Sequence, residues 1–177
     1  MASHQLLHAL SFAAAKHRDQ RRKNAEASPY INHPIEVANV LANEGAVTDE
    51  TMLMAAILHD TVEDTQTTFG ELESSFGKDV AELVRELSDD KTLPPAERKR
   101  LQIEHAAGSS LQARQLKLAD KICNLRDLAE CPPAKWSSTR REQYVTWSEQ
   151  VGAGCRGVNP GLEMAFDQAV ERARRAL

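Results

Sequence analysis

The stretch that decides the fold reads DETMLMAAILHDTVEDT and spans residues 49–65 of the chain. Residues 52–58 are apolar almost all the way round a helix, which indicates a buried central helix. His59, Asp60, Glu63 and Asp64 follow at its end, and a helical turn of about 100° per residue pairs His59 with Glu63 and Asp60 with Asp64. Buried charges without partners cost several kcal/mol, so a cation, an ion-pair network or solvent must meet these four groups.

Helical periodicity continues on both sides of this stretch. A second largely buried helix is expected from Leu111 to Leu128, before the break at Pro132-Pro133. No alternating run of β-branched residues indicates a strand. We therefore predict an all-α fold, a single compact domain of about eight to ten helices over residues 1–177. Further helices are expected at 3–17, 34–45, after the capping-box pair Thr68 and Glu71, after Gly77, after Pro94-Pro95, at 137–151 and at 160–177.

The composition limits the classes of partner. With a net charge of −4 and a pI near 5.9, the chain is not suited to a nucleic acid, although a local cluster of Arg and Lys can hold a small phosphorylated molecule. No segment is apolar enough for a membrane span. The three cysteines are odd in number and lack C-x-x-C spacing, which favours a reducing cytoplasm over a disulfide framework.

Two further residues make a metal site plausible. His33 precedes a helix, and Asp120 lies within the other strongly apolar helix. Taken alone, each feature has an ordinary explanation. His33 would be a surface or core histidine, Asp120 an ion-pair partner, and residues 59–64 a solvated acidic turn. Together with His59 and Asp60 they form a nitrogen and oxygen set suited to Mn²⁺, Fe²⁺ or Zn²⁺, and four protein ligands leave open positions on a six-coordinate ion such as Mn²⁺. His4, His8, His17 and His105 match no metal pattern and are expected at the surface.

These residues resemble the H…HD…D pattern of the HD-domain phosphohydrolases. The longer sequence motifs around these residues are similar to those of the hydrolase domain of RelA/SpoT proteins, and most closely to those of the stand-alone SpoT-like small alarmone hydrolases. The likeness spans nearly the whole chain. Its blocks are Arg22-Lys23, the run YINHP from Tyr30 to Pro34, HDTVEDT from His59 to Thr65, KLADK from Lys117 to Lys121, and NLRDL from Asn124 to Leu128.

The resemblance implies a function and a role for each block. It implies hydrolysis of guanosine 3′,5′-bis(diphosphate) (ppGpp), the stringent-response alarmone, to GDP and pyrophosphate in the cytoplasm. One Mn²⁺ per chain is the usual metal, although other divalent ions are open. The residues matching the family's metal ligands are His33, His59, Asp60 and Asp120, those matching its water-activating acids are Glu63 and Asp64, and those matching its substrate contacts are Arg22, Lys23, Asn124, Arg140 and Tyr144.

Other interpretations stay open at this point. The same metal site would serve an HD-domain nucleotidase or an NADPH phosphatase, or a helical protein that senses the nucleotide without cleaving it. The length of 177 residues leaves room for the hydrolase alone, without the synthetase and regulatory domains of the long enzymes. The sequence predicts neither the oligomeric state nor how Glu63 and Asp64 divide their work.

Overall fold

Ten α-helices and no strand make up residues 4–177, the part of the chain that the computed structural model describes. The all-α prediction and the expected number of helices are confirmed, and the predicted start of the first helix at Ser3 lies outside the described residues. The helices are α1 (His4–Lys16), α2 (Asn32–Asn43), α3 (Glu50–Leu58), α4 (Thr61–Asp64), α5 (Phe69–Phe76), α6 (Lys78–Leu87), α7 (Pro95–Ala106), α8 (Leu111–Glu130), α9 (Ser138–Gly154) and α10 (Pro160–Arg175).

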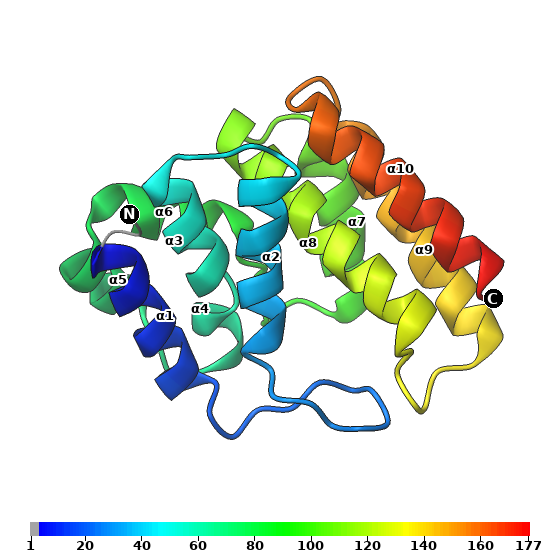
Figure 1. The fold of residues 1–177 in the computed structure, drawn as a ribbon, viewed down its shortest axis with the longest axis horizontal. Coiled ribbons are helices and arrows are strands. Elements are labelled where there is room, and N and C mark those ends of the chain that lie inside the picture. The colour runs from blue at the N-terminus through cyan, green and yellow to red at the C-terminus, as the bar shows by residue number, and fades with distance from the viewer. Residues whose placement is uncertain (1–3) are drawn as a thin grey trace.

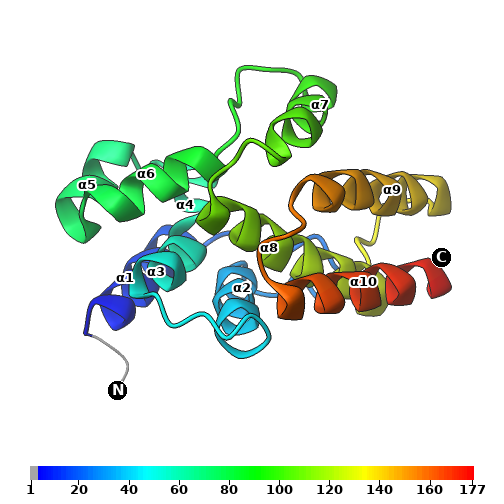
Figure 2. The same cartoon turned by 90° about the horizontal axis from the view of Figure 1, so that it is seen from above.

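The two apolar helices predicted from the sequence lie in the centre of the fold. Six of the nine residues of α3 are buried, from Met52 to Leu58. The twenty-residue helix α8 crosses the middle of the molecule, with α1, α3, α5 and α6 on one side and α9 and α10 on the other (Figure 2). Helix α2 packs against both α3 and α8 and stands between them (Figure 1). Residues carried by α2, α3 and α8 are thereby brought to one place.

Several helices begin at the capping residues predicted from the sequence. The hydroxyl of Thr68 accepts a hydrogen bond from the Glu71 amide at the start of α5, and Asn159 caps α10 ahead of Pro160. These side chains satisfy amides that have no partner within the first turn. Gly77, between α5 and α6, has a φ of +89°, a conformation that glycine adopts without strain.

The acidic stretch does not continue the helix α3, in contrast to the predicted single helix end. Helix α3 stops at Leu58, and the short helix α4 starts at Thr61. The Thr61 hydroxyl donates to the Leu58 carbonyl at 2.7 Å, and His59 Nδ1 lies 2.7 Å from the Ala56 carbonyl. Because side chains take these two carbonyls, the regular backbone ladder ends and the chain turns at His59 and Asp60.

The two last helices form part of the same core. Phe166 of α10 is 2% exposed, and its ring occupies the space that a Cβ at Gly152 of α9 would need. We expect Phe166→Ala to lower the free energy of unfolding by about 3–5 kcal/mol, since the lost ring leaves a cavity. Urea unfolding followed by circular dichroism measures this, with Met164→Ala on the exposed side of α10 as the control. Equal losses in the two variants would contradict the prediction.

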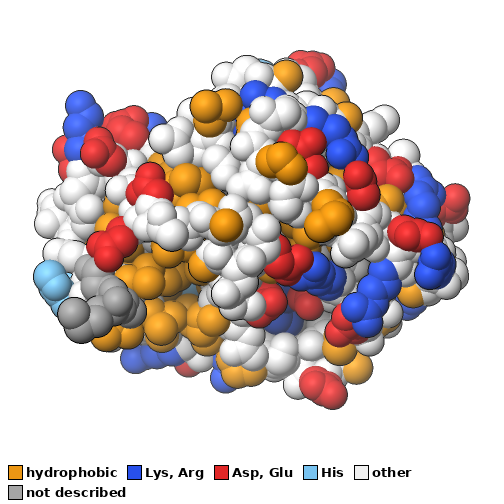
Figure 3. All heavy atoms as spheres, turned by 45° about the horizontal axis from the view of Figure 1, so that its top comes forward, with side chains coloured by type: hydrophobic (Ala, Val, Ile, Leu, Met, Phe, Trp, Pro, Cys, Tyr) orange, Lys and Arg blue, Asp and Glu red, His pale blue; other side chains and the backbone are white. Residues whose placement is uncertain are grey.

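The surface carries charges of both signs. On the face shown in Figure 3, Lys and Arg side chains are interspersed with Asp and Glu and form no continuous basic patch. Ion pairs within the described residues include Arg126 with Glu44 at 2.6 Å and Arg172 with Glu130 at 2.9 Å. Among residues 4–177, no helix is both long enough and apolar enough to cross a lipid bilayer.

Candidate metal centre

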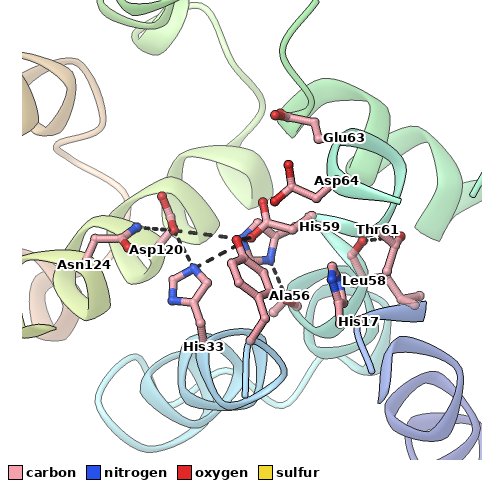
Figure 4. Close-up of polar contacts among 12 residues, drawn as sticks. His17, His33, Ala56, Leu58, His59, Thr61, Glu63, Asp64, Asp120 and Asn124 are labelled. Atoms are coloured by element: carbon pink, nitrogen blue, oxygen red, sulfur yellow. Dashed lines mark hydrogen bonds and ion pairs between the residues drawn. The ribbon is translucent and has the colours of Figure 1, made fainter. Parts of the chain in front are cut away.

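The four predicted metal ligands meet at the junction of α2, α3 and α8 (Figure 4). His33 Nε2 lies 3.1 Å from Asp120 Oδ1 and 3.8 Å from Asp60 Oδ2. His59 Nε2 lies 3.2 Å from Asp60 Oδ2 and 3.9 Å from Asp120 Oδ1. Donor atoms of His33, His59 and Asp60 are all within 4.8 Å of one another, and Asp120 adds an oxygen close to both imidazoles.

The chemistry of this cluster fits a divalent cation. His59 Nδ1 faces the Ala56 carbonyl, which only accepts, so Nδ1 carries the hydrogen and Nε2 of a neutral ring presents its lone pair. His59 Nε2 is buried, has no hydrogen-bond partner, and points at two carboxylates. A lone pair that faces carboxylates is unfavourable unless a proton or a metal cation lies between them. His33, His59 and Asp60 can therefore hold a divalent metal ion.

A layer of hydrogen bonds holds the two carboxylates in place. The Tyr30 hydroxyl donates to Asp60 Oδ2 at 2.6 Å. Asp120 accepts from Asn124 Nδ2 at 2.7 Å and from Lys121 Nζ at 2.8 Å. Lys121 is buried, with its ammonium 4.6 Å from the centre of the Trp147 ring. Such partners fix the orientation of metal ligands and make them better donors.

The electrostatics keep both aspartates ionised. Burial raises the pKa of Asp60, but the His59 and His33 imidazoles outweigh burial and hold this pKa below its ordinary range. For Asp120, burial likewise raises the pKa, while Lys121 and His33 bring it well below the ordinary value. Carboxylates are metal ligands in their ionised form, so both residues are ready to bind a cation.

Binding of a divalent ion is expected to release protons. Burial lowers the pKa of His59, but Asp60 and Asp120 outweigh burial and raise the pKa to about 9. His59 is therefore protonated below that pH in the ion-free protein, and a metal must displace the proton because a ligand imidazole is neutral. Affinity should fall as the pH is lowered from about 9. Titration calorimetry with Mn²⁺ at about pH 7, in two buffers of different ionisation enthalpy, measures the released protons. A binding enthalpy that is equal in the two buffers would contradict this.

The acid pair lies beside the cluster, and Figure 4 shows the Glu63 and Asp64 side chains above it. Glu63 Oε1 accepts from the backbone amide of Asp89 at 2.6 Å, and Asp64 Oδ2 accepts from Gln20 Nε2 at 3.0 Å. Lys91 Nζ is within 3.2 Å of both acids. Burial raises the pKa of Glu63, and the nearby Asp89 carboxylate raises it further. A carboxylate with a raised pKa is suited to accept and return a proton near neutral pH.

Three adjoining cavities surround the centre. The largest, about 710 Å³, is lined by the metal ligands, Glu63 and Asn124. A second, about 410 Å³, is lined by Arg22, Lys23, Asn124 and Tyr144, and a third, about 490 Å³, by Arg140 and Tyr144. Asn124 and Tyr144 are each shared between two cavities. All five predicted substrate residues thus line one or more of three cavities that share lining residues.

The predicted substrate residues differ in how they are held. Arg22 Nη2 donates to Asp127 at 2.5 Å and to Asn124 Oδ1 at 3.1 Å, so its guanidinium is already tied to α8. The Arg140 guanidinium lies 4.6 Å from the centre of the Trp136 ring, and Trp136 packs against Tyr144. Burial raises the pKa of Tyr144 to about 12, which keeps its hydroxyl protonated as a hydrogen-bond donor.

Several residues of the site were missed in the sequence. Tyr30 and Lys121 lie inside the quoted blocks, where a partner for each carboxylate could have been sought. Gln20 and Lys91 come from segments without periodicity, and no sequence signal marks them. His17 was wrongly expected at the surface: it is 1% exposed, and its Nδ1 lies 2.6 Å from Gln20 Oε1, behind Asp64. The other three histidines outside the centre, His4, His8 and His105, are exposed as predicted.

Two imidazoles and two carboxylates gathered between helices define a helical protein with a mixed histidine and aspartate cluster that can hold a divalent metal ion. The chain belongs to the HD domain family, whose model matches residues 9–150.

Named relatives extend the match over almost the whole chain. Proteins named guanosine-3′,5′-bis(diphosphate) 3′-pyrophosphohydrolase MESH1 are 56% identical in Homo sapiens and 55% identical in Xenopus tropicalis. Each alignment runs over 162 residues, 92% of this chain and 90% of the relative. A solved structure described as a metazoan ortholog of SpoT that hydrolyzes ppGpp and plays a role in starvation responses superposes with a TM-score of 0.95 and 49% identity, and covers 100% of this chain and 99% of that one. The resemblance to stand-alone SpoT-type proteins is confirmed.

Proposed function

We propose that this protein hydrolyses guanosine 3′,5′-bis(diphosphate) to GDP and pyrophosphate with the help of a divalent cation, Mn²⁺ in particular. The observation that carries the proposal is the convergence of His33, His59, Asp60 and Asp120 beside the acid pair Glu63 and Asp64. Relatives with more than half of their residues identical carry the name of this pyrophosphohydrolase, which supports the choice of substrate.

The reaction needs a water molecule, an acceptor for its proton and a place for negative charge. When bound, a divalent ion polarises a phosphoryl oxygen and makes a neighbouring water more acidic. Glu63 or Asp64 takes the proton from the attacking water. The water oxygen forms a bond to the phosphorus attached to the ribose 3′ oxygen, and the bond between this phosphorus and the 3′ oxygen breaks. The 3′ oxygen takes up the proton that the carboxylate accepted, so GDP is formed with a free 3′ hydroxyl and pyrophosphate is released.

The other proposed roles concern the binding of the nucleotide. Arg22, fixed by Asp127, offers a flat guanidinium face for the purine, and Lys23 offers a charge for a phosphate. Arg140 and Tyr144 line the further cavity and are placed for the remaining phosphates. Asn124 bonds Asp120 and lines two of the cavities, so it can contact the ribose while it holds a metal ligand.

The choice of Mn²⁺ rests on the donor set. The centre offers imidazole nitrogens and carboxylate oxygens and no thiolate. Four protein donors would close a tetrahedral zinc site, whereas a six-coordinate ion keeps positions for water and for a substrate oxygen. We also propose that residues 1–177 form one domain, since α10 beyond the family match packs on α8 and α9.

The test is incubation of the purified protein with the alarmone and Mn²⁺, with and without a chelator, followed by anion-exchange chromatography of the products. GDP and pyrophosphate in equal amounts, formed only without chelator, are the expected result. A parallel panel with NADPH and common nucleotides tests the other HD-type activities. Tight binding of an alarmone that stays intact over hours would favour a sensor and overturn the proposal.

A further inference from the structure

One loop supplies contacts to both members of the acid pair. This α6–α7 loop, residues 88–94, joins helix α6 to helix α7. Its Asp89 amide donates to Glu63 Oε1 at 2.6 Å. Its Lys91 Nζ lies 3.2 Å from Glu63 Oε2 and 3.0 Å from Asp64 Oδ1. Lys91 thus bridges two carboxylates that are neighbours in the chain and lie side by side in Figure 4.

The loop is held in shape by its own hydrogen bonds. The Asp89 carboxylate accepts from Gln102 Nε2 of α7 at 2.7 Å. Asp90 Oδ1 accepts from the amide and the hydroxyl of Thr92, at 2.9 and 2.6 Å, which closes a tight turn around Lys91. The position of the Lys91 side chain over the acids is therefore built into the loop and does not depend on Lys91 alone.

The charges around the acid pair are mostly negative. Asp60 and Asp89 lie near Glu63, and the neutral amide of Gln20 donates to Asp64 Oδ2. Lys91 is the cation that the described residues place within ion-pair distance of Glu63 and Asp64. Two adjacent carboxylates repel each other, and a shared ammonium group offsets that repulsion.

We propose that Lys91 is a positioning residue for hydrolysis, whose ammonium group holds the Glu63 and Asp64 carboxylates together and aimed at the place of the attacking water. The role deepens the proposed function and rests on it. Lys91 itself touches the acids and not the metal ligands, so its removal should leave the cation in place and misplace the proton acceptor.

The first experiment compares Lys91→Gln, Lys91→Arg and the matched control Lys78→Gln. Lys78 is exposed at the first residue of α6, about 15 Å of helix away from the loop. In Lys91→Gln we expect kcat to fall about 10- to 100-fold, as misplaced catalytic groups do, with KM changed less than about threefold and Mn²⁺ affinity unchanged. Lys91→Arg keeps the charge and should recover most of the lost kcat, and Lys78→Gln should match the wild type.

Two outcomes would overturn the inference: a Lys91→Gln variant with wild-type kcat, or a Lys91→Arg variant no faster than an impaired Lys91→Gln. A second measurement does not use turnover. Amide hydrogen exchange at Asp89 should speed up about tenfold or more in Lys91→Gln, because the clamp that aligns Glu63 with this amide is lost. If the wild type leaves the alarmone intact, the proposed function is wrong. Unchanged amide exchange in Lys91→Gln would separately contradict the role of Lys91 in holding the acid pair.

Discussion

His59→Gln is expected to bind Mn²⁺ at least about 100-fold more weakly than the wild type and to lose nearly all turnover. This loss of affinity should exceed the one caused by removing a residue that only hydrogen-bonds to a metal ligand. The glutamine can still reach the Ala56 carbonyl, while the lone pair of Nε2 that faces Asp60 and Asp120 is gone. The two carboxylates then keep only His33 Nε2 as a nitrogen donor near them. Titration calorimetry with Mn²⁺ and product assays at saturating Mn²⁺ measure the two losses.

Two controls separate loss of the ligand from loss of the fold. Tyr30→Phe removes only the hydroxyl that donates to Asp60, and should weaken the metal about 10- to 100-fold. His8→Gln changes an exposed histidine of α1 and should have no effect. Circular dichroism should show the same helix content in all three variants. If folded His59→Gln bound Mn²⁺ as tightly as the wild type, the proposed metal centre would be wrong.

The parts of the fold that were predicted from sequence depend on local signals. Helices α3 and α8 carry apolar residues on most sides, and Thr68 and Asn159 mark helix starts with side chains that bond the next turn. The break in the helix at His59 was missed because side chains and backbone amides compete there for the same carbonyl groups. The His59 ring and the Thr61 hydroxyl take carbonyls that a continued helix would use, and the sequence alone does not say which partner wins.

The site likewise contains residues that could be predicted from sequence motifs and residues that could not. Its metal ligands stand in short motifs, and their nearness follows once α2 is placed between α3 and α8. Gln20 and Lys91 bond different oxygens of the Asp64 carboxylate and come from segments separated from it by 44 and 27 residues. Neither segment has a periodic pattern, so their positions depend on how the whole chain packs. Arg22 was predicted as a substrate contact from the resemblance, and the sequence did not indicate that its guanidinium is paired with Asp127.

Glu63→Gln and Asp64→Asn are expected to lower kcat about 100- to 10,000-fold while Mn²⁺ affinity stays within about threefold of the wild type. Each change keeps the size of the side chain and removes the ability to take a proton. Because Asp89 and Lys91 hold Glu63 while Gln20 and Lys91 hold Asp64, the two acids are not equivalent, and the variant with the larger loss identifies the main proton acceptor. The residue with the raised pKa is Glu63, which makes it our first choice for the larger effect.

The pH dependence distinguishes an acid that accepts a proton from one that only orients water. If Glu63 is the acceptor, its carboxylate must be ionised, so kcat rises with pH through the raised pKa of Glu63 and then levels off. Glu63→Gln should remove this acidic limb from what activity remains, whereas Asp64→Asn should keep it. The same limb in both variants, with both kcat values near the wild type, would mean that neither acid accepts the proton and that another group near the metal does so.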